Sequence, residues 1–365
     1  MRIGLVIYGA LDTLSGGYLY DRMLVAHLRA CGDDVQIYSL PWRNYARHCA
    51  DNVSTAFARR MCDATVDVWL QDELNHPSLL RANALLRRMR DRAPIVSIVH
   101  HLRVSETHSS ALLAMYRVVE RAYLRSCDAF VFNSNATRAS VHALVGAGRA
   151  HVVAYPAADH LPVFVREEST TGALRLLAVG NLIERKGLHT TLTALRDVCG
   201  DWTLDVIGRD DVDPAYAARC RHIANVAGFG ARVRWRGRLD DAELARCYAS
   251  ADALVAPSQY EGFGIVYLEA MAAGLPVIAS TAGAAGEIVY DDVEGYLVPP
   301  ENPAATAAAI QRLFDPEQRR RLGRAACARG AAHPRWVDSA AAIRSFLVER
   351  VERVESMGER VNDRR

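Results

Sequence analysis

Lysine is almost absent from this chain. Among its 44 lysine and arginine residues, Lys186 is the single lysine, and the other 43 are arginines. Arginine evidently serves wherever a positive charge suffices. A position that keeps lysine is therefore expected to need a compact ammonium group on a flexible stem, in place of a planar guanidinium. Lys186 and the residues around it are therefore predicted to form a functional site.

Other absences narrow the class of protein. The eight cysteines form no Cys-x-x-Cys pair, which favours free thiols in a reducing compartment over zinc sites or disulfides. No apolar run approaches the ~20 residues of a membrane-spanning helix, and residues 1–10 are too short an apolar run for a signal peptide. The net charge of +2 gives no general attraction to nucleic acid. We expect a cytoplasmic enzyme with no nucleic-acid partner.

The length of 365 residues predicts two domains, because single cores rarely grow beyond ~250–300 residues. Apolar runs alternate with helical periodicity in both halves, which predicts an α/β protein with two parallel sheets. We place one domain at residues 1–160 and a second at 172–335, with a linker near 156–172. A helix over 338–354 within the segment 336–365 precedes a charged tail from Glu355, which we expect to fray.

The first strand, residues 2–8, leads through Gly16 and Gly17 into a helix over 18–30. This loop lacks the Gly-x-Gly-x-x-Gly fingerprint, so a nicotinamide cofactor is not indicated. A double glycine here is explained by a tight turn alone. Residues 42–62 predict either a helix pair that covers the sheet or a mobile flap beside the acceptor.

Polar side chains follow the strands over 66–70 and 95–99. Ligands of open α/β sheets bind outside the carboxyl ends of the strands. Asp72, Glu73 and His76 after the first of these strands, and Arg103 after the second, are therefore candidate acceptor contacts. His100 ends the second strand as either a structural histidine or a substrate contact.

A predicted helix over 79–89 and the residues after it carry several arginines, namely Arg81, Arg87, Arg88 and Arg90. The ordinary interpretation of such a run is a solvated face. The alternative is a patch for anionic lipid, which would make the protein peripheral at the inner membrane face.

In the second half, a strand over 174–179 leads into a loop bounded by Gly180 and Gly187, and a helix over 188–198 follows. Lys186 lies in this loop, beside Asn181 and Arg185. A glycine-framed loop between a strand and a helix presents backbone N–H groups to an anion. The single lysine therefore occupies a position suited to phosphate.

Residues 257–269 form the most informative stretch. A buried strand over 253–256 ends at Pro257, a loop with two glycines follows, and a helix begins near Ile265. Glu261 precedes this helix and Glu269 lies eight positions later, so both carboxylates are expected to face one cleft. On its own, the Glu-Gly-Phe-Gly turn is equally explained as a helix cap.

These residues together resemble the group 1 retaining glycosyltransferases, the glycogen-synthase and sucrose-synthase type. That resemblance implies a GT-B fold: two Rossmann-like domains that face a central cleft, with the C-terminal helix crossing back to the N-terminal domain. It implies catalytic roles for Glu261, His100 and Lys186. It also implies nucleotide-sugar contacts, at Gly16, Gly17, Asn181, Lys186, Arg238, Phe263, Gly264, Ile265 and Glu269.

The chain departs from the family pattern at two positions. Asn181 stands where relatives commonly carry arginine, so one phosphate contact is unassigned; Arg185 either replaces it or, as we expect, points to solvent. His101 stands where many members carry aspartate, which leaves the neighbouring acceptor geometry open.

The implied reaction moves a hexosyl group from a UDP- or GDP-sugar to a hydroxyl acceptor (a glycan, lipid-linked sugar or small molecule) in carbohydrate biosynthesis, with retention. We expect no cofactor and no metal, because Lys186 and backbone amides can replace a divalent ion. The helix-and-phosphate context disfavours a glycosidase pair. A sugar-nucleotide epimerase of the same architecture and a catalytically silent partner subunit stay open as alternatives.

Overall fold

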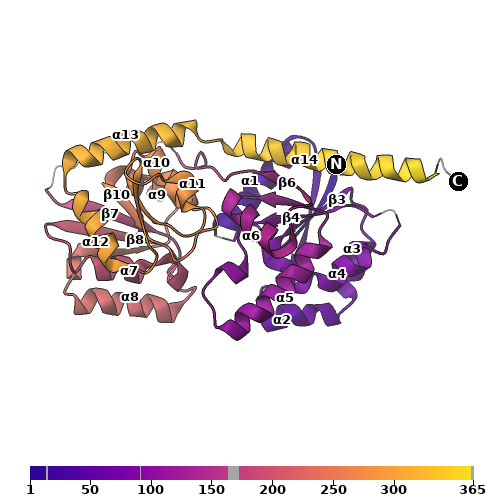
Figure 1. Cartoon of the computed structure of the whole chain (residues 1–365), viewed down its shortest axis with the longest axis horizontal. Coiled ribbons are helices and arrows are strands. Elements are labelled where there is room, and N and C mark those ends of the chain that lie inside the picture. Colours follow the sequence, from indigo (N-terminus) through magenta and orange to yellow (C-terminus); the bar gives the residue numbers. More distant parts are fainter. Residues whose placement is uncertain (14, 91, 163–171, 363–365) are drawn as a thin grey trace. The chain divides into compact units, whose positions relative to one another are not determined.

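A computed structural model describes residues 1–13, 15–90, 92–162 and 172–362 (Figure 1). The chain divides into two compact units. One consists of Met1–Pro156 together with Trp336–Arg365, and the other of Ala157–Arg335. Residues 163–171 of the predicted linker lie outside the described residues. The predicted α/β class is confirmed, because each unit is built around its own parallel sheet.

The sheet of the first unit has six parallel strands in the order β2-β1-β3-β4-β5-β6. Its central strands are buried at every position and mostly apolar, as expected for a parallel sheet covered on both faces. The strands are β1 Arg2–Tyr8, β2 Asp34–Leu40, β3 Val68–Asp72, β4 Ile95–Val99, β5 Ala129–Phe132 and β6 Ala150–Val153.

The helices of the first unit connect these strands. The segment 42–62, for which a helix pair or a flap was expected, forms α2 and α3, and Ala58 and Met61 of α3 enter the core. The α-helices are α1 Gly16–Ala30, α2 Tyr45–Ala50, α3 Ala56–Cys62, α4 Leu80–Leu86, α5 Ser110–Ser126 and α6 Asn135–Val145. Short 3-10 turns are η1 Asp51–Val53, η2 Glu73–Ser78 and η3 Arg103–Ser105.

The second unit repeats the plan, with strand order β12-β11-β10-β7-β8-β9. The strands are β7 Leu174–Val179, β8 Trp202–Ile207, β9 Val233–Gly237, β10 Ala253–Ala256, β11 Val277–Ser280 and β12 Gly295–Val298. The helices are α7 Leu188–Ala194, α8 Pro214–Val226, α9 Asp241–Ser250, α10 Ile265–Ala272, α11 Ala285–Ile288, α12 Pro303–Arg312 and α13 Pro316–Ala332, with 3-10 turns η4 Glu184–Lys186 and η5 Gly230–Arg232. Sequence reasoning missed β12 and α13.

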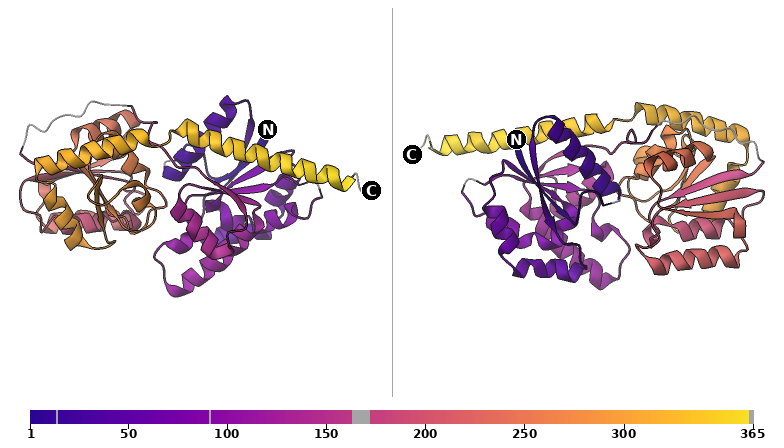
Figure 2. Two further views of the ribbon diagram at one scale, coloured as in Figure 1. Left: turned by 45° about the horizontal axis from the view of Figure 1, so that its top comes forward. Right: turned by 180° about the vertical axis from the view of Figure 1, so that it is seen from behind.

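The last helix, α14 Trp336–Asn362, belongs to the first unit, where it packs against α1 and β6 (Figure 2). The Ser339 hydroxyl donates to the Tyr155 carbonyl at 2.5 Å, and Arg344 Nε lies 2.7 Å from Asp33 Oδ2. The expectation that the C-terminal helix crosses back to the N-terminal domain is thus confirmed. The expectation of a frayed tail from Glu355 is wrong, because the helix continues to Asn362. Its charged residues are good helix formers.

None of the helices among the described residues combines the length and the apolar character that a transmembrane segment requires.

We predict that Arg344→Ala loosens α14 from the first unit. Burial raises the pKa of Asp33, but Arg344 and the Met1 amino group outweigh it and hold that pKa below its usual value. The stabilisation is therefore present above the unfolded pKa near ~4 and lost as pH falls through the lower folded pKa. At pH 7 we expect a fall of about 2–4 °C in melting temperature, as for loss of about 1 kcal/mol, with faster amide exchange in α14.

The matched control is Arg353→Ala on the same helix. Arg353 pairs only at the surface, with Glu349 at 3.0 Å, and such pairs contribute little. Equal effects of the two substitutions would contradict a specific docking role for Arg344.

Candidate active site

Lys186 ends the 3-10 turn η4, which follows β7 of the second unit. Its Nζ donates to Oε1 of Glu261, which is 6% exposed. The Ser258 hydroxyl donates to the same oxygen at 3.2 Å. We call Arg185, Lys186, Ser258 and Glu261 the Lys186 cluster. The other carboxylate oxygen of Glu261, Oε2, makes none of these contacts.

Close backbone contacts hold the Lys186 loop against the loop that carries Glu261. Gly187 has φ +71°, and a Cβ there would lie 2.3 Å from the Pro257 carbonyl oxygen. The Gln259 amide donates to the Arg185 carbonyl at 2.8 Å. On the other side, a Cβ on Gly283 would lie 2.0 Å from the Glu261 carbonyl oxygen. Only glycine fits these two contacts, so the backbone fixes where Lys186 and Glu261 meet.

Glu261 is held as a carboxylate by its neighbours. Burial raises its pKa, but the charges of Lys186 and Arg185 and the hydrogen bonds it accepts outweigh burial and bring the pKa below the usual value. Arg185 Nη1 donates to the Tyr260 carbonyl at 2.9 Å and lies 3.9 Å from Glu261 Oε1. The expectation that Arg185 points to solvent is therefore wrong, because the Tyr260 carbonyl and the Glu261 carboxylate draw it inward.

The helix α10 begins directly after this loop. Gly264 is its N-cap with φ +99°, and a Cβ there would lie 2.3 Å from the Tyr267 ring. No side chain caps the helix start, so the first amides of α10, from Ile265 on, are available to an anion. Phe263 is buried and anchors the loop. A cavity beside the helix is lined by Gly180, Asn181, Lys186, Ser258, Glu261 and Val266, among others.

Glu269 lines a different cavity from Glu261. Tyr248 donates its hydroxyl proton to Glu269 Oε2 at 2.6 Å, and His160 Nε2 lies 3.3 Å from Oε1. Ala157, Leu161, Ala249 and Pro334 line this second cavity together with Glu269. The helical spacing that suggested one shared cleft does not apply, because α10 starts after Glu261.

Two other positions of the second unit contribute less. Arg238 is exposed, just after β9, and it lines neither of these cavities. An Asp-x-Asp spacing, often a metal site, occurs at Asp211 and Asp213. Asp213 caps α8 and Asp211 pairs with Arg209 at 2.8 Å, so both carboxylates have structural partners.

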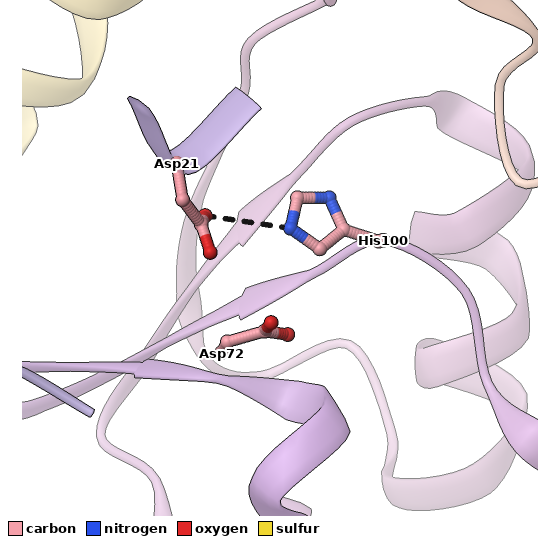
Figure 3. A group of neighbouring side chains, drawn as sticks. All are labelled: Asp21, Asp72 and His100. Carbon is pink, nitrogen blue, oxygen red and sulfur yellow. Dashed lines mark ion pairs between the residues drawn. The ribbon is translucent and has the colours of Figure 1, made fainter. Parts of the chain in front are cut away.

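In the first unit, His100 lies directly after β4 and meets the start of α1. A Cβ on Gly17 would lie 3.1 Å from the His100 ring, so glycine permits this approach. Nε2 of His100 lies 3.5 Å from Oδ1 of Asp21, a fully buried residue of α1. Asp72, the last residue of β3, lies beside them (Figure 3). We call Asp21, Asp72 and His100 the His100 cluster.

Burial and like charge shift the pKa values in this cluster. Burial and the Asp21 carboxylate raise the pKa of Asp72 to about 7. Burial lowers the pKa of His100, but Asp21 and Asp72 outweigh burial and raise it above its usual value. Burial likewise raises the pKa of Glu73 to about 8. Glu73 is therefore mostly protonated at neutral pH, while Asp72 titrates there.

Glu73, His76 and Glu120 form a neighbouring buried group. His76 Nδ1 lies 3.0 Å from Glu73 Oε1, and the Tyr45 hydroxyl lies 2.9 Å from Nε2. Burial lowers the pKa of His76 to about 4. The Glu120 carboxylate accepts from the Arg103 amide at 2.5 Å. Both ring nitrogens of His76 are thus engaged inside the protein, one with the Glu73 backbone carbonyl and one with Tyr45, which makes His76 a weak acceptor candidate. Glu73 is buried, and its Oε1 accepts no hydrogen bond within the described structure.

Arg103 is more accessible. Its guanidinium lies over the rings of Tyr45 and Tyr116, at 5.5 and 5.1 Å from their centroids, and its side chain is partly exposed. His101 Nε2 lies 2.9 Å from Glu106 Oε1. The aspartate expected from relatives is therefore replaced here by a histidine–glutamate pair.

The predicted arginine-rich helix is shorter than expected. Because α4 ends at Leu86, Arg87, Arg88 and Arg90 follow the helix and do not share its face. Arg87 Nη1 donates to the Ser126 carbonyl at 3.1 Å, and Arg81 bonds to the backbone of the segment before α3. These two arginines are engaged within the protein.

Ligand atoms of the His100 cluster lie within 4.8 Å of one another, as do those of Glu73, His76 and Glu120. Either set has the chemistry to hold a divalent cation. Sequence reasoning missed Asp21 and Glu120. A signal for Asp21 exists: it is a carboxylate on the face of α1 that otherwise carries buried residues such as Tyr18, Leu24 and Leu28.

Comparison with known proteins identifies a family for part of the chain. Residues 164–329 match the family "Glycosyl transferases group 1". Glycogen synthase of Mycobacterium tuberculosis is 32% identical over 243 residues, which are 64% of this chain and 58% of that protein. The matched region thus spans less than two thirds of this relative's length.

Two solved structures share the fold over both units. Sucrose-phosphate synthase from Thermosynechococcus elongatus has a TM-score of 0.83 at 23% identity, with 95% of this chain and 98% of that chain covered. An Anabaena protein in complex with UDP and glucose has a TM-score of 0.76 at 18% identity, with 96% and 100% covered. The segment 164–329 thus belongs to the group 1 glycosyltransferases, and the chain as a whole has the two-unit GT-B fold.

Proposed function

We propose that this protein transfers a hexosyl group from a nucleoside diphosphate sugar to a hydroxyl acceptor, with retention of configuration and without a metal ion. The observation that carries the proposal is the Lys186 cluster: the only lysine of the chain lies beside a buried glutamate, in a cavity next to the uncapped start of α10. The Anabaena relative in fold is bound to UDP and glucose, which supports UDP among the candidate nucleotides, with GDP as the other.

The cluster suits the departure of a nucleoside diphosphate. Breaking the bond to the sugar builds negative charge on the diphosphate oxygens. A fixed ammonium at Lys186 and the first amides of α10 would meet that charge without reorganising, which is the most effective form of electrostatic catalysis. Arg185, held by the Tyr260 carbonyl, adds a second positive charge nearby and can supply the contact that Asn181 lacks.

Glu261 would act on the sugar. Because its pKa is held below the usual value, it is a carboxylate at any physiological pH. Its Oε2, outside the contacts of the Lys186 cluster, can accept hydrogen bonds from sugar hydroxyls. A carboxylate there also stabilises positive charge that develops at the anomeric carbon. Phe263 and Gly264 would hold the loop that presents these groups.

The remaining contacts are assigned to the nucleoside and the acceptor. Glu269 would accept hydrogen bonds from the ribose hydroxyls, replacing the contact with His160. Gly16 and Gly17 would approach the phosphates. His100 and Asp72 would contact sugar hydroxyls, with Arg103 at the acceptor. The acceptor itself is a hydroxyl compound of the glycan, lipid-linked sugar or small-molecule class.

The direct test is incubation with UDP-, GDP- and ADP-sugars in the presence of EDTA, after a thermal-shift screen for the donor that binds. Nucleotide released only when an acceptor is present, with a retained anomeric centre by NMR, supports the proposal. An isomerised donor would instead identify an epimerase. Failure to bind any donor would identify a silent partner subunit.

We predict that Lys186→Arg lowers kcat by about 10- to 100-fold with little change in donor affinity. The guanidinium keeps the charge but cannot place it at one point beside Glu261, and removal of one preorganised donor typically costs ~100-fold or more. Steady-state kinetics of nucleotide release measures the effect. Arg219→Lys is the matched control, since this exposed arginine pairs with Glu184 of the same loop. Wild-type kinetics in Lys186→Arg would remove the lysine from the mechanism.

We predict that Glu269→Gln weakens binding of the nucleoside diphosphate by about tenfold, or ~1.4 kcal/mol. Glutamine keeps an acceptor for the Tyr248 hydroxyl but loses the charge that holds the ribose hydroxyls. Isothermal titration calorimetry measures the affinity. Tyr248→Phe is the control, because it removes the hydroxyl contact and keeps the carboxylate; an equal loss in both variants would assign Glu269 a structural role only.

A further inference from the structure

Two carboxylates lie inside the first unit without an arginine or lysine to balance them. Asp21 on α1 is fully buried, and neither of its oxygens accepts a hydrogen bond within the described residues. Asp72, at the end of β3, is 2% exposed. Although the chain has 43 arginines, the basic group beside these carboxylates is His100. Buried carboxylates are costly unless they are paired or bind a metal, so this place calls for positive charge.

The three side chains of the His100 cluster converge from separate elements (Figure 3). Nε2 of His100 is buried without a hydrogen-bond partner, and it lies 3.5 Å from Oδ1 of Asp21, which is longer than an ordinary hydrogen bond. Two ligands of a tetrahedral zinc ion are separated by ~3.4 Å. The hydrogen bond that Asp72 accepts from the Leu74 amide ends on Oδ1, so its Oδ2 remains for a ligand.

We propose that Asp21, Asp72 and His100 bind one divalent transition-metal ion inside the first unit, with Zn²⁺ as the best match. Two carboxylates and a neutral imidazole carry the two negative charges that such an ion balances. Zinc accepts both kinds of ligand, and three protein ligands leave its fourth position to water. Mg²⁺ prefers an octahedron of oxygen atoms and keeps several waters, so it fits this enclosed set poorly.

The neighbouring group of Glu73, His76 and Glu120 is less suited to an ion. Nδ1 of His76 lies 3.0 Å from the Glu73 carbonyl oxygen, and Nε2 lies 2.9 Å from the Tyr45 hydroxyl. Oε1 of Glu120 accepts from the Arg103 amide. A metal would have to displace these contacts, whereas Nε2 of His100 and both oxygens of Asp21 have no hydrogen bond to lose.

The ion would join α1 to the ends of β3 and β4, three elements that are far apart in the sequence. It would hold Nε2 of His100 and leave the other ring nitrogen, which points away from both carboxylates in Figure 3, to a substrate. This inference goes beyond the proposed function, in which Lys186 of the other unit meets the charge of the diphosphate. The ion takes no part in that step.

The test is Zn²⁺ binding by the untagged full-length protein after a chelator has stripped it of metal. Isothermal titration calorimetry with Zn²⁺ alone should show one equivalent per chain. The melting temperature should rise by roughly 5–10 °C at a Zn²⁺ concentration 100-fold above Kd. X-ray absorption at the zinc edge should show nitrogen and oxygen ligands without sulfur. Mg²⁺ in place of Zn²⁺ should neither bind nor shift the melting temperature.

In Asp21→Asn we expect the Kd for Zn²⁺ to rise by more than ~100-fold, because loss of a mere second-shell partner already weakens metal sites by 10- to 100-fold. The substitution keeps the shape of the side chain and removes a buried charge, so the stripped variant should melt no lower than the stripped wild type. If it does not fold, Asp72→Asn replaces it, since the amide oxygen can still accept from Leu74.

Two controls separate this site from its competitors. Glu73→Gln alters a buried carboxylate of the neighbouring group and should leave Zn²⁺ binding unchanged. Cys31→Ser removes the obvious surface alternative, because Cys31 is exposed and its Sγ lies 3.6 Å from Nε2 of His27; it should also leave binding unchanged.

Four results would overturn the proposal: no binding at micromolar Zn²⁺, equal binding in a folded Asp21→Asn, loss of binding in Cys31→Ser, or loss of binding in Glu73→Gln. The first would show that the cluster holds no ion. The second would place the ion away from Asp21. The last two would assign it to the surface pair and to the neighbouring group, respectively.

Zinc binding is measured without activity, so the two proposals fail separately. One equivalent of zinc in a protein that transfers no sugar would refute the proposed function alone. Sugar transfer by a protein that binds no zinc would refute the cation site alone. Lys186→Arg, in the other unit, should leave zinc binding unchanged.

Discussion

The ion pair between Lys186 and Glu261 is the interaction on which the second unit's site depends. Two loops, which follow the neighbouring strands β7 and β10, must come together to form it, and glycines at positions 187 and 283 permit the backbone contacts that achieve this. A buried glutamate is costly unless it is paired. The lysine therefore stabilises the folded loops and at the same time keeps Glu261 ionised. The Lys186 ammonium and the Glu261 carboxylate thus serve both the folding of the two loops and the chemistry of the site.

The first unit also contains a buried carboxylate beside a basic side chain, but the residues differ. In both units a buried carboxylate lies beside a basic side chain that follows a parallel strand: Glu261 with Lys186 after β7, and Asp21 with His100 after β4. The carboxyl ends of parallel strands are where such sheets place ligands. The Lys186 ammonium contacts its carboxylate directly, whereas Nε2 of His100 lies 3.5 Å from Oδ1 of Asp21.

The sequence predicted much of this because its signals are local. The lone lysine between two glycines and the Glu-Gly-Phe-Gly turn lie in short segments whose backbone geometry is set by glycine. Asp21 and Glu120 were not predicted as site residues, because their roles depend on partners that are distant in the sequence, His100 and Arg103. Arg185 was misplaced for the same reason, since the Tyr260 carbonyl that holds it is far away in the chain. The separate cavities of Glu261 and Glu269 were not predicted, because the eight-residue spacing was counted in helical turns from Glu261, which lies in the loop before α10.

The exclusion of lysine elsewhere in the chain explains why position 186 is informative. Its neighbour Arg185 already places a planar guanidinium against a backbone carbonyl, where several donors are useful. At position 186 the side chain passes the Gly180 backbone, where a Cβ would lie 3.5 Å from its Cδ and Cε, and ends at a single carboxylate oxygen. A slender stem with a point charge fits that path, and a branched head does not. The two adjacent cations thus differ because their surroundings differ, and an arginine-rich composition makes that difference visible in the sequence.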